Sequence, residues 1–338
     1  METTKKKRDI KRILLDNAIY IILLVIIAVI VILEPSFFNI RNASFILAQA
    51  SPRLILALGV AGIIILGGTD LAAGRMVGMA AVITASLLQD PNSILRVYPN
   101  MPQLPVILPI LLAMLICAAF SVFHGFMVAK FKVAPFIASL GIQQIVFGAF
   151  SIYFQNLNDA QPLASLDPKF TAFVQTGFSI GSFWCPMIII YAVLCTIIMY
   201  FIWNKTKIGK NMYAVGGNPE AATVCGVNLL KTFLLVYFIA GMLYGFSGSL
   251  EAARTGSVTN QLGAEYALDA IAACVVGGVS MRGGIGRISG VVIGVVVFQV
   301  INYGLNYLGV NPYMQYIVKG AIILVAVAID TQKYLKKK

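Results

Sequence analysis

The sequence has little charge, a single histidine and few cysteines, and each shortage excludes a class of function. Only 11% of the 338 residues are Asp, Glu, Lys or Arg, whereas soluble domains carry about 25%. The one histidine, His124, excludes multi-histidine metal sites. The 5 cysteines show no CxxC spacing, so they are interpreted as small packing residues and not as ligands. The sequence therefore predicts no metal site.

A nucleotide-binding signature is missing as well. There is no GxxxxGK[ST] loop, so this chain cannot hold ATP in the usual P-loop manner. The single histidine also excludes the HExxH pair of zinc proteases. We expect a chain that is not an enzyme, with no catalytic residues and no cofactor of its own. His124 then has two interpretations, a helix-packing residue or a proton relay.

Long uncharged apolar runs fill the chain, and 59% of its residues are hydrophobic. Most runs reach the roughly 17–25 residues that a helix needs to cross a bilayer, and they lack the strict alternation of barrel strands. The predicted fold class is an all-α polytopic membrane protein with about ten transmembrane helices. We expect these helices near residues 17–33, 44–67, 75–89, 105–129, 134–155, 184–203, 229–250, 267–279, 288–307 and 313–330.

The distribution of charge sets the expected orientation. The net charge of +12 comes mostly from Lys and Arg at the two ends and in every second loop. The positive-inside rule places such segments in the cytoplasm, so both termini are expected there and nucleic acid is not an expected partner. Eight crossings remain an alternative if some glycine-broken segments are re-entrant. The outer segment 254–266 is a candidate for a short surface helix.

Two short apolar segments are interrupted by glycine pairs, one in each half of the chain. Irregular backbone at membrane depth is tolerated only where protein or a water-filled path satisfies it, and paired breaks are typical of transport pathways. Asp70 and Arg75 follow the first break, and ionisable groups in a membrane are costly. A polar turn that merely organises the break is the alternative for these two. The path candidates are Gly67, Gly68, Asp70, Arg75, Gly277 and Gly278.

The longest polar interruption, 204–231, contains its own helix signal at 218–225. Asn218 can cap the helix, Pro219 suits its first position and Glu220 favours its positive end. Ala221 and Ala222 continue the helix, and Gly226 is a plausible stop. Gly216 and Gly217 would let the chain turn sharply into the cap. So short a helix needs a partner surface, although an unpartnered helix at the membrane surface is an alternative.

Four blocks in order resemble the permeases of ribose- and galactose-type ABC importers over nearly the whole chain. They are GGTDLAAGRMVG (67–78), PFIASLGI (135–142), GGNPEAATVCGV (216–227) and LDAIAACVVGGVSMRGGIG (268–286). The segment 301–322, INYGLNYLGVNPYMQYIVKGAI, is especially similar to the galactose/methyl-galactoside branch. Arg282 stands where the family usually has a small or uncharged residue, which leaves its role open.

The resemblance implies a single transmembrane permease domain, 1–338, with the fold of vitamin-B12 and ribose importers. It also implies a homodimer in the lipid of the bacterial inner membrane, bound to a cytoplasmic ATPase that carries ATP and Mg. A periplasmic or lipid-anchored sugar-binding protein would deliver the sugar. The helix at 218–225 would be the coupling helix, with Gly216, Gly217, Asn218, Pro219, Glu220, Ala221, Ala222 and Gly226 as ATPase-coupling residues.

Charged residues predicted outside are candidates for docking the binding protein. They are Arg53, Arg96, Lys169 and Arg254. Glu251 and Arg254 fit a simple i,i+3 pair, and Lys319 either reaches the membrane surface or lines the path. A self-sufficient secondary sugar transporter or channel, with Asp70 as its coupling carboxylate, is the alternative function. An integral membrane enzyme is a third possibility, which the missing motifs disfavour.

Overall fold

The computed structural model describes residues 18–159 and 161–335. The two basic ends, 5–12 and 336–338, lie outside the described residues. Their cytoplasmic placement therefore stays a prediction. The elements in chain order are α2 Ala18–Leu33, η1 Pro35–Phe37, α3 Ile40–Ile65, α4 Ala73–Leu87, α5 Ile107–Phe131, α6 Pro135–Asn158, α7 Pro168–Gln175, β1 Gly177–Ile180, β2 Phe183–Pro186, α8 Met187–Lys205, α9 Lys207–Gly217, α10 Pro219–Val224, α11 Leu229–Thr255, α12 Tyr266–Val276, α13 Ile288–Tyr307 and α14 Pro312–Leu335.

The helices confirm the predicted class of polytopic helical membrane protein. In the described part, 6 helices are long and apolar enough to cross a membrane, namely α3, α5, α6, α8, α11 and α13. Shorter apolar helices or helix segments lie in α2, α4, α12 and α14. Each helix expected from the sequence therefore has a counterpart, whether or not it crosses the whole bilayer.

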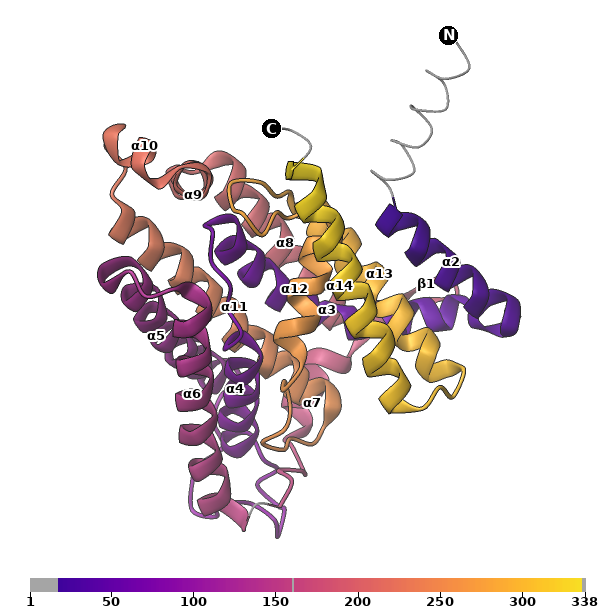
Figure 1. Cartoon of the computed structure of the whole chain (residues 1–338). Helices are drawn as coiled ribbons and strands as arrows, with labels where there is room; N and C mark the ends of the chain where they lie inside the picture. Colours follow the sequence, from indigo (N-terminus) through magenta and orange to yellow (C-terminus); the bar gives the residue numbers. More distant parts are fainter. Residues whose placement is uncertain (1–17, 160, 336–338) are drawn as a thin grey trace.

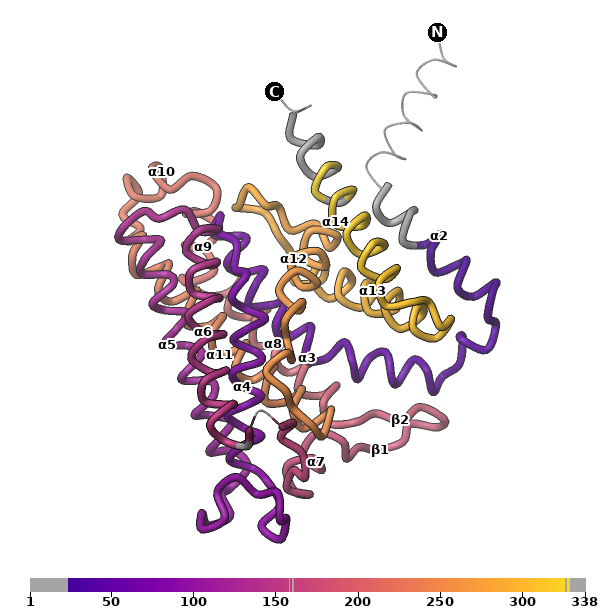
Figure 2. The backbone as a smooth tube through the Cα atoms, turned by 60° about the horizontal axis from the view of Figure 1, so that its bottom comes forward, coloured from indigo at the N-terminus to yellow at the C-terminus, as the bar shows by residue number. Residues whose placement is uncertain are grey.

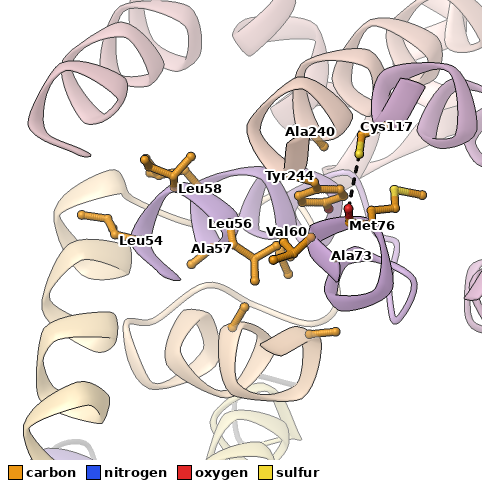
Figure 3. Close-up of a cluster of buried hydrophobic side chains, with 14 of the residues drawn as sticks. Leu54, Leu56, Ala57, Leu58, Val60, Ala73, Met76, Cys117, Ala240 and Tyr244 are labelled. Atoms are coloured by element: carbon orange, nitrogen blue, oxygen red, sulfur yellow. Dashed lines mark hydrogen bonds between the residues drawn. The ribbon is translucent and has the colours of Figure 1, made fainter. Parts of the chain in front are cut away.

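The second half of α3 is the centre of the fold. Every residue from Leu54 to Leu66 is buried, because α4, α8, α11, α12 and α13 all pack on this helix. Figure 3 shows Val60 close to Met76 of α4 and Tyr244 of α11. A helix that is apolar on all sides is stable only when other helices surround it. Hydrophobicity alone did not distinguish this central helix from its neighbours.

Helix α11 packs closely on α5, and small residues make that approach possible. A Cβ atom on Gly245 would lie 2.4 Å from the Cα of Met114, closer than real contacts allow. A Cβ atom on Gly241 would likewise lie 2.6 Å from the Cα of Ala118. Small residues at one-turn spacing let membrane helices approach backbone to backbone.

The predicted polar outer segments contain more structure than the sequence indicated. Residues 156–182 include α7, which Asp167 caps by accepting the backbone N–H of Lys169 at 2.8 Å, and the strand β1. β1 pairs antiparallel with β2, as Figure 2 shows beside α7. The predicted surface helix in 254–266 is wrong, because that described segment consists of turns and a β-bridge from Val258 to Leu163.

One enzyme-like spacing occurs in this region, contrary to the expectation of a chain without such signatures. Residues 177–181 read GFSIG and match the GxSxG pattern of a hydrolase nucleophile. They form β1 and the turn of the hairpin, whereas a catalytic serine of that type sits on a sharp turn from a strand into a helix. The match is therefore a coincidence of spacing.

The segment 204–231 contains two helices, α9 and α10, where the sequence predicted one. Thr206 caps α9, and Met212 and Val215 are buried on its inner face. Gly216 and Gly217 are the last residues of α9, so the predicted sharp turn at this position is wrong. The turn into α10 is made by Asn218 in an extended conformation.

Candidate functional site

Helix α10 is short, capped and exposed. The side chain of Asn218 accepts the backbone N–H of Ala221 at 3.0 Å, and Pro219 is the first helical residue. Gly226, with φ of 82°, follows the last turn. Ala222 is buried, while the other residues of α10 face outward, with Val224 at 89% exposure. A rigid helix that presents an apolar side chain to the outside has the form of a docking element.

Helix α10 lies at the opposite end of the molecule from α7 in both views (Figures 1 and 2), and Figure 2 shows the hairpin on the α7 side. The end of α3 and the loop that follows α12 contact α9 at the α10 end, so the first predicted path break is close to the predicted coupling residues. Nothing in the sequence indicated that the path residues and the coupling residues are close together.

The two predicted glycine breaks have the same backbone geometry. At the end of α3, Gly67 has φ of 89°, and at the end of α12, Gly278 has φ of 83°. The N–H groups of Gly67 and Gly278 donate to the third-preceding carbonyl, at 2.9 Å in both cases. The following residues, Gly68 and Val279, donate to the fifth-preceding carbonyl, again at 2.9 Å. Both helices therefore end in a Schellman cap, in which Gly67 corresponds to Gly278.

A cluster of glycines joins α9 to the break after α3 and to the loop that follows the break after α12, and we call it the glycine junction: Gly67, Gly216, Gly217, Gly283 and Gly284. The N–H of Gly284 donates to the carbonyl of Ile65 at 2.7 Å. A Cβ on Gly216 would lie 1.8 Å from that same oxygen. A Cβ on Gly283 would lie 2.6 Å from the carbonyl oxygen of Gly216. Backbone packs on backbone here, so no flexible side chains separate α9 from the end of α3 and the loop after α12.

Tyr213 reinforces the glycine junction from α9. Its hydroxyl donates to the carbonyl of Gly286 at 2.9 Å. Burial raises the pKa of Tyr213, so the hydroxyl keeps the proton that it donates. The sequence did not predict Tyr213, Gly283 or Gly284 as site residues. The glycine pair in the block 268–286 was visible in the sequence, but its contact with α9 was not.

The chain after the first break leads to a second contact, between the starts of α4 and α12. From Gly67 an extended segment runs back to the start of α4 (Figure 1). There a Cβ on Gly74 would lie 2.3 Å from the carbonyl oxygen of Gly263 and 3.0 Å from the backbone N of Ala267. The short helices α4 and α12 therefore begin side by side, which is the arrangement that transport proteins use around a substrate path.

Asp70 lies in the extended segment and is fully buried. Its Oδ1 accepts the backbone N–H of Ala72 at 2.9 Å and lies 3.6 Å from Nδ1 of His124. His124 packs edge-on against Tyr237, with ring centroids 4.8 Å apart. Within the described residues, Oδ2 of Asp70 and both ring nitrogens of His124 have no hydrogen-bond partner. These contacts fit the reading of Asp70 as the organiser of a polar turn.

Arg75 lies beside the segment predicted outside. Its guanidinium lies 4.0 Å from the ring centroid of Phe147, and Nη1 is 3.5 Å from the carbonyl oxygen of Asn260, which belongs to that segment. The extended course of 67–72 carries the chain back into the protein before α4 begins and so brings Arg75 to this position.

We expect Asp70→Asn to retain sugar uptake close to the unmodified level, because an amide oxygen can still accept the N–H of Ala72. Asp70→Ala removes that acceptor and should destabilise the protein by about 1–3 kcal/mol. Thermal unfolding in detergent and uptake by whole cells measure the two effects. Complete loss of uptake in a well-folded Asp70→Asn protein would favour the coupling-carboxylate function.

The four predicted docking residues divide into two pairs. Arg53 is not on an outer loop, because it lies inside α3. Its guanidinium donates a hydrogen bond to Gln299, and its Cζ lies 5.0 Å from the ring centroid of Tyr266. Arg254 forms the predicted i,i+3 pair with Glu251 at 2.8 Å. Arg96 and Lys169 lie where the segment 88–106 meets the start of α7, and Lys169 is exposed. The docking role of Arg96 and Lys169 stays a prediction.

Comparison with known proteins identifies the family. The family description "Branched-chain amino acid transport system / permease component" matches residues 42–327. The chain belongs to this permease family. The permease is 51% identical over 323 residues to the galactose/methyl galactoside import permease protein MglC of Haemophilus influenzae, covering 96% of both chains.

Two further relatives extend this comparison. The protein of the same name from Escherichia coli K12 is 49% identical over 332 residues, covering 98% of each chain. The ribose import permease protein RbsC of Bacillus subtilis is 32% identical over 342 residues, covering 98% of the permease and 99% of that protein. No solved structure matches. The permease is a transport subunit, not an enzyme, and a multi-pass protein of the bacterial inner membrane.

Proposed function

We propose that this permease is the membrane subunit of an ATP-binding cassette importer that moves galactose and methyl galactosides into the cell. Relatives covering nearly the full chain carry that activity in their names, at 49% to 51% identity. The ribose-type relatives are 32% to 33% identical, which favours the galactose branch. A sugar-binding protein outside would deliver the sugar, with Arg96 and Lys169 as docking candidates through charge complementarity.

The observation that carries the proposal is the connection of α10, through α9, to the break after α3 and to the loop that follows the break after α12. Helix α10 is the coupling helix in this proposal, and Glu220, Thr223 and Val224 are exposed for docking in a separate ATPase. Helix α9 contacts the end of α3 at Ile65 and the loop after α12 at Gly283 and Gly284. ATP, with Mg, would bind the partner, and ATP hydrolysis there would move α10 as a rigid body. The movement would reach both segments through the glycine junction.

The assembly follows from the same assignment. We propose ten crossings by α2, α3, α4, α5, α6, α8, α11, α12, α13 and α14, with both termini cytoplasmic and the fold of the vitamin-B12 and ribose importers. Two copies form the pathway between them, and each copy binds one ATPase chain. Exposed apolar side chains on α14, including Leu324 at 74%, supply surface for the second copy or for lipid.

Co-purification tests the function directly. The tagged permease is expressed together with an ABC ATPase and a sugar-binding protein of the same organism, extracted in mild detergent and reconstituted in vesicles. We expect an ATPase to co-purify with α10 intact, and galactose uptake to require ATP. Uptake driven by an ion gradient by the permease alone would instead establish the secondary transporter.

A further inference from the structure

The β1–β2 hairpin carries no charged residue, although most of it lies in a predicted polar outer segment. No Asp, Glu, Lys or Arg occurs between Lys169 and Lys205, a stretch that contains the hairpin and nearly all of α8. Other outer loops do carry charges, including Asp90 and Arg96 in the segment 88–106. The hairpin therefore has the composition of the membrane helix that follows it and not that of a loop in water.

The two faces of the hairpin differ, and both present large side chains to the outside. Cross-strand pairing of Ile180 with Phe183 and the alternation along β1 place Phe178, Ile180 and Phe183 on one face. Ser179 pairs with Trp184, so these two lie on the opposite face. Phe178 is 47% exposed, Ile180 62% and Trp184 46%. A two-stranded hairpin is at best marginally stable in water, and exposed apolar side chains make water a poor environment for it.

The contacts of the hairpin place it where α8 reaches the edge of the bilayer. The hydroxyl of Ser44 in α3 donates to the carbonyl of Trp184, and the hairpin runs alongside the first half of α3 (Figure 2). Tyr191, in the second turn of α8, donates to the carbonyl of Phe173 in α7 at 3.0 Å. α8 has 19 residues and is therefore about 28 Å long, close to the thickness of the hydrocarbon core. Since β2 leads directly into α8, the hairpin lies at the boundary of that core.

Lipid is the partner that these features fit. Only 22% of the apolar window of α8 is buried inside the protein, so most of this helix contacts lipid, and the hairpin continues its surface. Tryptophan concentrates at the level of the lipid headgroups, where its ring and its N–H are both satisfied. The face with Ser179 and Trp184 suits the headgroups, and the face with Phe178 and Ile180 suits the acyl chains. A soluble protein partner is normally selected through complementary charges, which the hairpin lacks.

We propose that the β1–β2 hairpin is a membrane anchor, which lies in the leaflet away from α10. Trp184 is at the level of the headgroups, and Phe178 and Ile180 are among the upper parts of the acyl chains. Through the hydrogen bonds of Ser44 and Tyr191, the anchor holds the adjoining parts of α3, α7 and α8 at a fixed depth. The inference goes beyond the proposed function, because it holds whichever sugar the permease carries.

Tryptophan fluorescence tests the anchor, because the chain contains only 2 tryptophans, Trp184 and Trp203. Trp203 is buried, and Trp203→Phe leaves Trp184 as the single reporter. The full-length permease is reconstituted in vesicles of phospholipids that carry bromine, a contact quencher, at defined positions of the acyl chain. We expect bromine near the headgroup to reduce the emission of Trp184 more than bromine near the chain end. Iodide dissolved in the water should reduce it little.

Two matched reporters calibrate the depth, in a background where Trp184 and Trp203 are both replaced by Phe. Ile180→Trp moves the reporter to the apolar face of the hairpin, and its emission should be reduced by bromine deeper in the acyl chain than that of Trp184. Ile94→Trp makes the same change at a fully exposed position of the segment 88–106. Its emission should be reduced by iodide and not by brominated lipid.

Three outcomes would overturn the anchor. Quenching of Trp184 by iodide and not by brominated lipid would place the hairpin in water. Protection from that iodide quenching when a sugar-binding protein is added would assign the hairpin to protein docking. Resistance of Trp184 to both quenchers would mean that a second copy of the chain covers the hairpin. None of these measurements depends on sugar uptake, so failure of the anchor is distinguishable from failure of the proposed function.

Discussion

Replacing Gly216 with alanine is expected to abolish sugar transport. The new Cβ would lie 1.8 Å from the carbonyl oxygen of Ile65 and 2.8 Å from the backbone N of Gly284. Both neighbours are backbone atoms, so α9 must move away from the junction and the Gly284–Ile65 hydrogen bond is lost. Overpacking of this kind costs about 1–3 kcal/mol. We expect uptake and sugar-stimulated ATP hydrolysis both to be lost, because α9 can no longer pack on the end of α3.

Gly217 provides the matched control for this substitution. It is the next residue of the same helix, and a Cβ there meets no atom within 4 Å. Gly217→Ala should therefore transport sugar like the unmodified permease. Reconstituted uptake, ATP hydrolysis and the yield of monodisperse protein separate lost coupling from misfolding. Equal activity of the two alanine variants would contradict the role of the junction in transmitting movement from α10.

Reversing the charge of Glu220 is expected to uncouple the permease from its ATPase. Glu220 is exposed in the first turn of α10, so the change to lysine affects the docking face and leaves the membrane core untouched. Loss of the favourable interaction with the helix dipole costs only about 0.3–1 kcal/mol, so the helix itself persists. A like charge placed against a partner surface costs several kcal/mol. We expect sugar-stimulated ATP hydrolysis to be abolished while membrane insertion stays intact.

Two control variants define this result. Glu220→Gln keeps the shape without the charge and should retain part of the coupling. Arg41→Glu reverses an exposed charge in the first turn of α3, at the end of that helix opposite to the one that contacts α9, and should have no effect. Pull-down of the ATPase and ATP hydrolysis in vesicles measure docking and coupling separately. Normal ATPase binding by Glu220→Lys would argue against docking through α10.

The sequence alone predicted features that depend on neighbouring residues. The helical runs of α5, α6, α8, α11 and α13 were visible because each is a continuous apolar stretch of membrane length. Helix α10 was visible because Asn218, Pro219 and Gly226 are local capping signals. Helix α9 was missed because a polar, glycine-containing segment has weak helical signals, and its inner face is stabilised only by packing.

The candidate site shows the same division. The Schellman caps at Gly67 and Gly278 could be anticipated from glycine after an apolar helix. The contacts of Gly216 with Ile65 and of Arg53 with Gln299 could not, because each joins residues far apart in the chain. Arg53 looked like an outer-loop charge because loops usually carry the charges of a membrane protein, and only packing provided partners for it inside α3.

The amino-acid sequence by itself determined that this protein is a helical membrane permease with a small capped helix on its polar side. It did so because apolar length and capping chemistry act between residues that are close in the chain. Only the tertiary structure decided that α3 is the buried centre and that glycines join α9 to the end of α3 and to the loop after α12. These features arise from the packing of distant helices, which local patterns do not specify.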